Sequence, residues 1–206
     1  MDEWKEETLK MITVLMASYN GSRYIRQQLD SILAQDEEDV RILVSDDCSS
    51  DGSRELLKEY EASRGDRVLV LLRKEPSGGA AVHFLKLLKL MADAAHGPEE
   101  QPQHGSLLPE YEMTKSQLAH LGRLAGADYF MLSDQDDVWL PQKARMLSDK
   151  MKEMEGEPGH SRLPLLVHSD LTVTDEELRP IADSLSGIRQ FPRNAPARPS
   201  FWYRTM

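Results

Sequence analysis

Short apolar runs alternate with helical patterns from residue 11 to residue 154, and this alternation restricts the folds open to the chain. Each run is rich in aliphatic or β-branched residues, which is typical of a buried strand. Between the runs, apolar residues recur every three or four positions, which is typical of amphipathic helices. The pattern predicts an α/β fold with a mainly parallel sheet flanked by helices. The predicted strands are Met11–Met16, Val40–Ser45, Val68–Leu72, Tyr129–Leu132 and Leu163–Val167, and the predicted helices are Ser22–Ala34, Ser53–Ser63, Ala80–Ala95, Thr114–Ala125 and Pro141–Met154.

Two segments depart from this rhythm. Residues 96–113 carry several glycines and prolines among Glu, Gln and His, which predicts a mobile surface insertion. Leu171–Thr174 is predicted to form a short additional strand, which places the end of the domain near residue 178. Residues 179–206 are dominated by Pro, Arg and Ser, so we expect a poorly ordered tail after a domain that spans residues 11–178.

A dense acidic cluster follows the strand predicted at Tyr129–Leu132. Asp134, Asp136 and Asp137 fall within four residues, directly before Trp139. Carboxylates this close repel one another, and a bound cation relieves the repulsion. A divalent-metal site and a solvated acidic turn are both compatible with this stretch when it is considered alone.

Polar clusters also end two other predicted strands. Ser18, Tyr19 and Asn20 follow the first strand, and Asp46 and Asp47 follow the second. In parallel sheets, ligands bind outside the carboxyl ends of the strands, so these clusters should meet the acidic one at a single edge. That convergence favours the metal site. The Asp46–Asp47 pair is suited to accept the N3–H of uracil or thymine, although a helix-capping role is the alternative.

Composition limits the function further. The chain has 206 residues and a net charge of −10, which suits one α/β domain and argues against a general nucleic-acid binder. Cys48 is the only cysteine, so no internal disulfide is possible, in keeping with a reducing cytoplasm. The amino terminus lacks a signal-peptide core, and no apolar run reaches 18 residues, so we expect no transmembrane segment.

Other site types fit the sequence less well. A receiver domain would need its paired aspartates after the first strand, where this chain has Ser18 and Tyr19. The Gly78–Gly79 pair lacks the Gly-Lys-Ser/Thr of a phosphate-binding loop, and the six histidines show no zinc spacing. Arg73 and Lys74 are suited either to a phosphate group or to a solvated loop.

Taken together, three motifs resemble family 2 glycosyltransferases of the GT-A fold. They are Ala17-Ser18-Tyr19-Asn20-Gly21, Val44-Ser45-Asp46-Asp47 with Ser49-Ser50-Asp51-Gly52-Ser53, and Ser133-Asp134-Gln135-Asp136-Asp137-Val138-Trp139. The third motif, together with His168-Ser169-Asp170-Leu171 and Asp175, resembles the rhamnosyltransferase-like branch, which builds bacterial surface polysaccharides. The resemblance covers about residues 11–178.

The resemblance implies a DXD motif that binds Mg²⁺ or Mn²⁺ and, through the metal, the donor diphosphate. Asp134 and Asp136 would form this motif, with Asp136 as the more direct ligand and Asp137 as a neighbour of the metal site. The metal would stabilise the departing nucleotide.

The resemblance also implies a nucleotide pocket. Asp46 or Asp47 would hold the base, and Ser18 and Tyr19 would line the pocket. The implied reaction is inverting transfer from a nucleotide-sugar donor, dTDP-rhamnose or a UDP-sugar, to a glycan or lipid-linked acceptor. The implied location is the cytoplasm, near the inner face of the membrane.

The chain departs from the family in three places. His83 precedes Phe84 where the family often has Asn, and residues 96–113 lengthen the route to the acidic strand. The family also places its catalytic base and acceptor-binding half well after the DXD motif, and Asp170 and Asp175 come too early for that role. We therefore expect a fold that is incomplete at the C-terminus, and no catalytic base is identified.

Two alternatives remain open from the sequence. The first is a catalytically inactive nucleotide-sugar-binding fragment or partner subunit. The second is a metal-dependent nucleotidyltransferase. The lack of a Gly-rich basic loop after the first strand counts against this alternative.

Overall fold

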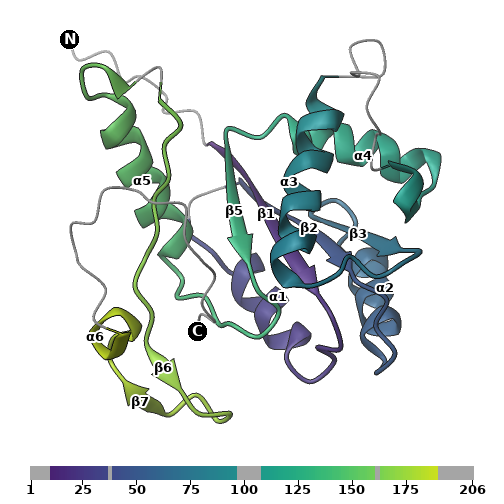
Figure 1. Ribbon diagram of the computed structural model, residues 1–206, viewed down its shortest axis with the longest axis horizontal. Coiled ribbons are helices and arrows are strands. Elements are labelled where there is room, and N and C mark those ends of the chain that lie inside the picture. Colours follow the sequence, from purple (N-terminus) through teal and green to yellow (C-terminus); the bar gives the residue numbers. More distant parts are fainter. Residues whose placement is uncertain (1–9, 37–38, 97–107, 161–162, 190–206) are drawn as a thin grey trace.

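A mainly parallel sheet forms the centre of the molecule (Figure 1). The computed structural model describes residues 10–36, 39–96, 108–160 and 163–189. Within them, five strands pair in the order β4-β3-β2-β1-β5, and only β4 runs antiparallel to its neighbour. The strands are β1 (Met11–Ser18), β2 (Asp39–Asp46), β3 (Val68–Arg73), β4 (Tyr111–Glu112) and β5 (Tyr129–Ser133). The helices of this domain are α1 (Ile25–Leu33), α2 (Ser53–Arg64), α3 (Ala80–Ala95), α4 (Lys115–Ala125) and α5 (Lys143–Glu155). The predicted α/β architecture is confirmed.

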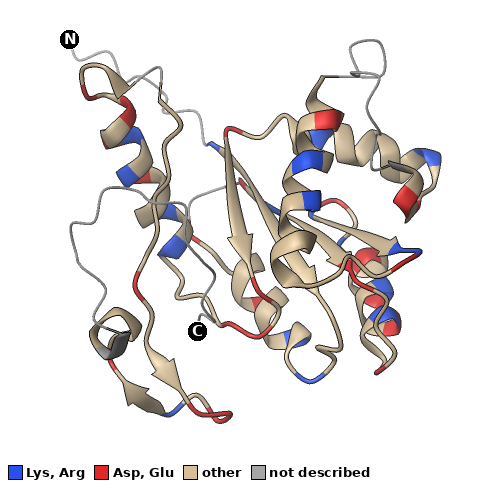
Figure 2. Ribbon diagram, in the orientation of Figure 1, with Lys and Arg blue, Asp and Glu red and all other residues tan. Residues whose placement is uncertain are grey.

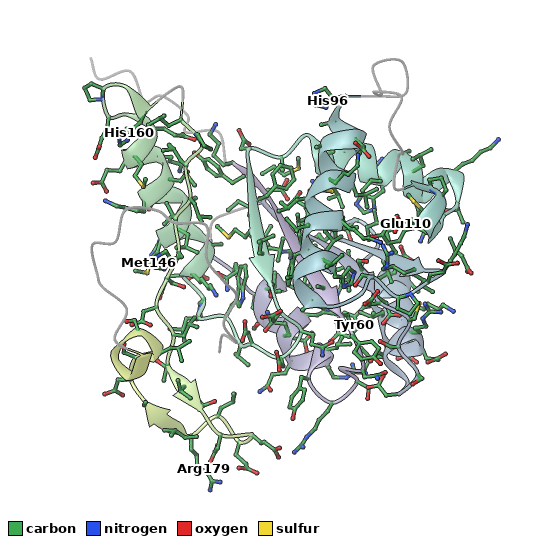
Figure 3. All side chains as sticks on the ribbon, in the orientation of Figure 1. Tyr60, His96, Glu110, Met146, His160 and Arg179 are labelled. Carbon is green, nitrogen blue, oxygen red and sulfur yellow. The ribbon has the colours of Figure 1, made fainter. Side chains whose placement is uncertain are left out.

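The sheet is buried on both faces, which explains why its central strands are continuous apolar runs. Side chains of β1 alternate between the two faces, as strand geometry requires. Val14 and Met16 pack toward α1 and α2, whereas Leu15 and Ala17 pack toward α3 and α4. The interior between sheet and helices is filled by side chains on both faces (Figure 3).

Strand β5 is less well covered than the other parallel strands. Its burial alternates along the strand, and Phe130 and Leu132 are each 41% exposed. Leu15, the direct neighbour of Leu132 in β1, is fully buried. Among the described residues no strand pairs with the outer edge of β5, so β5 is an edge strand.

The strand expected at Leu163–Val167 is not formed. These residues have no regular secondary structure, and Leu163 and Leu166 are 57% and 77% exposed. The segment follows α5 and does not join the sheet (Figure 1). Its apolar composition predicted a strand, but an isolated run becomes one only when a neighbouring edge supplies hydrogen bonds.

Two segments expected to be irregular contain regular structure. Leu108–Glu110 forms a 3₁₀ turn that leads into β4. Strand β4 pairs with β3, and its Tyr111 is buried. Residues 97–107 of the predicted insertion lie outside the described residues. Past residue 178, β7 (Pro180–Ala182) pairs with β6 (Val173–Thr174), and α6 (Leu185–Arg189) follows. The rest of the expected tail, 190–206, lies outside the described residues.

Helix positions agree closely with the sequence patterns. Helix α3 has the predicted bounds, and α4 begins after Thr114, whose side chain accepts a hydrogen bond from the Gln117 N–H. The Gln117 side chain accepts in return from the Thr114 backbone, which completes a capping box. None of the described helices has the length and apolar character needed to cross a lipid bilayer.

Candidate functional site at the carboxyl edge of the sheet

The three polar clusters meet at the carboxyl edge of the sheet. Ser18 pairs with Asp46 in the register between β1 and β2, and Ser133 pairs with Met16 between β1 and β5. The segment that follows β5, residues 134–137, is called the acid loop below. Figure 2 shows acidic residues gathered in the loops at this edge.

Polar side chains of α1, and of Gln35 just past its end, anchor the acid loop at both ends. Gln28 is fully buried, and its Nε2 donates to the Ser133 Oγ at 2.6 Å. The Trp139 N–H donates to the Ser31 Oγ at 3.0 Å, and Gln35 accepts from the Ala144 N–H at 2.8 Å. Buried hydrogen bonds of this kind hold a loop in one arrangement. The acid loop is therefore fixed by the helix that follows β1.

Asp137 points toward the protein interior rather than toward the open edge. It is 1% exposed, and its charge acts on Lys143. Burial lowers the pKa of Lys143, and Asp137 partly offsets that effect. The Lys143 Nζ also lies 4.4 Å from the centre of the Trp139 ring, in a cation–π contact. Asp137 thus stabilises the loop and the start of α5.

Asp134 and Asp136 flank Gln135 and are both half-buried. Across the described part of the chain, no group of three or more His, Cys, Asp or Glu residues is placed to hold a metal ion. Mg²⁺ is commonly bound by one or two carboxylates with substrate phosphate oxygens and water, rather than by an all-protein cage. Two carboxylates beside an open edge fit that mode of binding, in which the diphosphate itself completes the coordination.

Asp46 forms an ion pair with Arg54. It is fully buried, and its Oδ1 accepts from the Arg54 Nε at 2.7 Å and from the Ser49 N–H at 3.1 Å. Its Oδ2 accepts from the Ser49 hydroxyl. Burial of Arg54 acts to lower its pKa, but the hydrogen bond to Asp46 and the charge of Asp46 outweigh that effect, so the pKa of Arg54 is raised. The Asp46 carboxylate is occupied by its own loop.

Asp47 is held beside the loop that follows β3. The Ser77 N–H and hydroxyl donate to its two oxygens at 2.6 and 2.7 Å, and the Arg73 Nε lies 3.2 Å away. Arg73 is 2% exposed and also donates to Glu110 at 2.5 Å and to the Tyr111 hydroxyl at 3.3 Å. Arg73 is therefore an interior partner of Asp47. The Asp47 side chain keeps 10% exposure toward the edge.

His83 completes the buried polar layer under Asp47. Its Nε2 lies 2.7 Å from the Ser45 Oγ, and His83 is 2% exposed. Burial lowers the pKa of His83 to about 4, although the charge of Asp47 acts in the opposite direction. The imidazole is therefore neutral at pH 7.

Ser18 and Tyr19 present different groups at the same edge. Ser18 is 1% exposed, and no described protein group forms a hydrogen bond with its Oγ. Tyr19 is 58% exposed, so its ring is accessible for stacking. The Tyr19 backbone is bound by the side chain of Gln135, with distances of 2.7 Å from Tyr19 N to Oε1 and 2.8 Å from Nε2 to Tyr19 O. The structure thus brings Ser18 and Tyr19 to the same edge of the sheet as Asp134 and Asp136.

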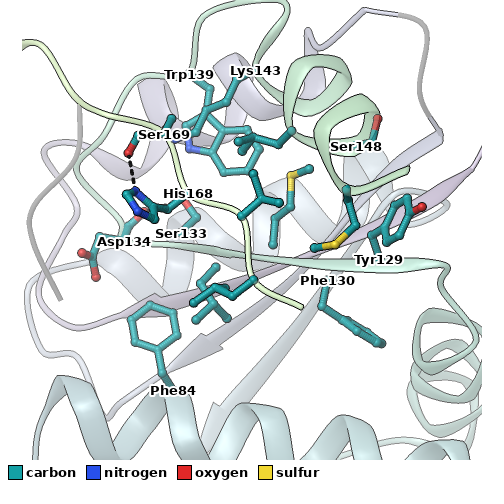
Figure 4. Close-up of a pocket in the computed structure, with 16 residues that line it drawn as sticks. Phe84, Tyr129, Phe130, Ser133, Asp134, Trp139, Lys143, Ser148, His168 and Ser169 are labelled. Carbon is teal, nitrogen blue, oxygen red and sulfur yellow. Dashed lines mark hydrogen bonds between the residues drawn. The ribbon is translucent and has the colours of Figure 1, made fainter. Parts of the chain in front are cut away.

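A cavity of about 280 Å³ lies next to the acid loop, along the outer edge of β5 (Figure 4). Phe84 and Phe130 lie on one side of the strand and Trp139 on the other. His168 and Ser169, from the segment that follows α5, close the end nearest Asp134. The cavity is lined by the apolar groups that β5 leaves uncovered, with polar groups at one end.

The sequence patterns missed the residues that position the site. Gln28 lies on the same helical face as Ile25, Leu29 and Ile32, all buried, and this placement was the available signal. A glutamine among core positions of an amphipathic helix indicates a buried hydrogen bond. The role of Gln135 had no sequence signal beyond its place between two aspartates.

The amino-terminal part of the chain matches a known family. Residues 13–89 match the model of glycosyl transferase family 2, a range that runs from within β1 to within α3 and contains the polar clusters that end β1 and β2. The acid loop lies beyond the matched range.

Two curated proteins are similar to longer or overlapping parts of the chain. The dTDP-rhamnosyl transferase RfbG of Shigella flexneri is 28% identical over 134 residues, which cover 65% of this chain and 36% of that protein. A putative teichuronic acid biosynthesis glycosyltransferase of Bacillus subtilis, TuaG, is 35% identical over 80 residues, or 39% of this chain and 30% of that protein. The matched part of this chain thus spans about a third of each relative.

Two solved structures also align with the chain. TarS of S. aureus in complex with UDP aligns with a TM-score of 0.46 at 17% identity and covers 82% of this chain and 43% of that one. The mannosyltransferase PcManGT of Pyrobaculum calidifontis, in complex with GDP-Man and Mn²⁺, aligns with a TM-score of 0.43 at 18% identity, over 74% of this chain and 34% of that one.

Proposed function

We propose that the chain is the donor-binding part of an inverting glycosyltransferase that uses Mg²⁺ or Mn²⁺. The donor is a nucleotide sugar, dTDP-rhamnose or a UDP-sugar, and the acceptor is a glycan or lipid-linked sugar of a surface polysaccharide. The observation that carries this proposal is the meeting of the ends of β1, β2 and β5 at one edge, in a chain whose residues 13–89 match the model of glycosyl transferase family 2.

On the nucleotide side, the proposed roles differ between the two aspartates. Asp47 is favoured as the residue that contacts the base, because its side chain keeps some exposure at the edge while Asp46 has none. The Ser18 hydroxyl, which no described protein group binds, is suited to a ligand hydrogen bond. The exposed Tyr19 ring offers a stacking surface for the base.

On the phosphate side, Asp134 and Asp136 would hold the metal ion together with diphosphate oxygens. When bound, the metal supplies positive charge to the departing nucleotide. The net charge of the chain is −10, so a diphosphate needs such a cation to approach an acidic edge. The donor dTDP-rhamnose takes support from RfbG, which is named as a dTDP-rhamnosyl transferase.

Isothermal titration calorimetry tests the proposal. We expect UDP or dTDP to bind in the presence of Mn²⁺, and Asp136→Ala to weaken that binding at least about tenfold, because one of two metal carboxylates is lost. Asp149→Ala is the matched control, since Asp149 lies exposed on α5 and pairs only weakly with Lys152 at 3.5 Å. Binding that does not depend on the metal, or that Asp136→Ala leaves unchanged, would contradict the proposal.

A second candidate is a nucleotide-sugar-binding protein without catalysis of its own. It is favoured by coverage, since the chain spans 36% and 30% of two curated relatives, and by the lack of an identified catalytic base. An assay of sugar transfer and donor hydrolysis separates the two candidates. Turnover above background that Asp136→Ala abolishes supports the enzyme, whereas metal-dependent binding without turnover supports the second candidate.

A further inference from the structure

The side-chain amide of Gln135 binds both main-chain groups of one distant residue. The Tyr19 N–H donates to Oε1 at 2.7 Å, and Nε2 donates to the Tyr19 carbonyl at 2.8 Å. The amide thus replaces a neighbouring strand at the point where β1 ends. It connects the acid loop to the loop that follows β1, across 116 residues of sequence.

Gly21 makes room for this contact. A Cβ atom at position 21 would lie 2.3 Å from the Gln135 Oε1 and 2.4 Å from its carbonyl carbon. Gly21 is not among the described glycines with positive φ, so close approach rather than backbone conformation accounts for glycine here. Gln135 and Gly21 therefore form one packed unit.

The loop that contains Tyr19 is held on its opposite side by the β2–α2 loop. The Asn20 N–H donates to the Ser49 Oγ at 2.8 Å, and the Gly21 N–H donates to the Ser53 Oγ at 2.9 Å. Gln135 holds the same loop from the side of Asp134 and Asp136. The proposed base contacts and the proposed metal ligands are thus connected through this amide.

We infer that Gln135 is a positioning residue that couples the two halves of a nucleoside-diphosphate site. The inference rests on the proposed function. A ligand that bridges the Tyr19 loop and the acid loop binds more tightly when the two loops are already fixed relative to each other, because less order must be imposed on binding. Metal bound at the acid loop then raises the affinity for nucleotide at Tyr19, and bound nucleotide raises the affinity for the metal by the same factor.

The test compares the full chain with Gln135→Met, which keeps the length of the side chain and removes both hydrogen bonds. Affinity for UDP and dTDP is measured by calorimetry with Mn²⁺ and with EDTA. Wild type is expected to bind more tightly with Mn²⁺, and Gln135→Met to lose about tenfold in affinity with Mn²⁺ and little with EDTA. Gln142→Met, at an exposed position that makes no capping bond at the start of α5, is the control.

A second pair of variants probes the contact from the other side. Gly21→Ala alone is expected to lower the melting temperature and the nucleotide affinity, because its Cβ meets Gln135. In a Gln135→Ala background, Gly21→Ala should add little, because the clashing amide is gone. This comparison remains informative if Gln135→Met folds poorly.

Each outcome has one meaning. A Mn²⁺-dependent affinity that falls in Gln135→Met, with a melting temperature close to that of Gln142→Met, supports the inference. If wild type binds nucleotide with Mn²⁺ and Gln135→Met binds equally well, the inference is overturned while the proposed function stands. If wild type binds neither UDP nor dTDP, the proposed nucleotide site is overturned and the coupling with it.

Discussion

At the scale of single residues, the carboxyl edge has two kinds of polar group. Asp46, Arg73 and His83 are buried beneath the edge and bind other protein groups. Tyr19 and Asp136 lie at the surface of the edge, where a ligand can reach them. Buried polar groups of the first kind stabilise one arrangement of the loops only while their hydrogen bonds and charges remain matched.

His83 makes the stability of the fold depend on pH. Burial lowers its pKa to about 4, so the unfolded chain binds more protons than the folded chain between pH 6.5 and 4. The free energy of unfolding should therefore fall as the pH falls through this window, by up to about 1.4 kcal/mol per pH unit from this residue. His83→Asn, which keeps a polar partner for Ser45, should show a smaller decline.

Urea unfolding at several pH values between 7 and 4.5 measures this difference. Other groups titrate in the same range, so the informative quantity is the slope for wild type minus the slope for His83→Asn. Equal slopes would show that His83 is protonated as easily in the folded protein as in the unfolded chain.

At the scale of elements, the sequence predicted most of the sheet and its helices, because periodicity reports burial directly. Helix α3 was predicted at its observed bounds, and β1, β2, β3 and β5 were predicted to within two residues at each end. The strand predicted at Leu163–Val167 was wrong, because strand formation depends on a partner edge that periodicity cannot reveal. Strand β4 was not predicted, because a strand of two residues is too short to show a hydrophobic periodicity.

The same limit applies to the site. Asp46, Asp47, Asp134 and Asp136 were recognisable because charged groups at strand ends stand out against apolar runs. What could not be predicted was which carboxylates the protein itself occupies, since Arg54 reaches Asp46 from a different helix. Pairing across elements depends on three-dimensional packing.

Because β5 is an edge strand, we expect alanine substitutions of two neighbouring leucines to lower the free energy of unfolding by unequal amounts. Leu15 and Leu132 are paired across β1 and β5, yet Leu15 is fully buried and Leu132 is 41% exposed. Leu15→Ala should cost about 3 kcal/mol of unfolding free energy, and Leu132→Ala less than about 1 kcal/mol. Urea unfolding at neutral pH compares the two variants. A similar large loss for both would show that β5 is covered in solution.

At the scale of the whole molecule, the sheet holds the three clusters in one site. Parallel β1, β2 and β5 have their carboxyl ends at the same edge, and the connecting helices hold the loops in place. The chain spans 36% of RfbG and 30% of TuaG. The central claim is that this edge binds a metal ion and a nucleoside diphosphate together.

Paramagnetic relaxation by Mn²⁺ tests that claim most directly, because it locates the ion within the protein. Amide signals of uniformly ¹⁵N-labelled protein are recorded with Mn²⁺, with and without UDP or dTDP, and Mg²⁺ serves as the diamagnetic control. The proposed site predicts selective broadening of residues 18–20, 46–47 and 134–137 when nucleotide is present, and much less in Asp136→Ala. Broadening centred elsewhere, or none when Mn²⁺ and nucleotide are both present, would contradict it.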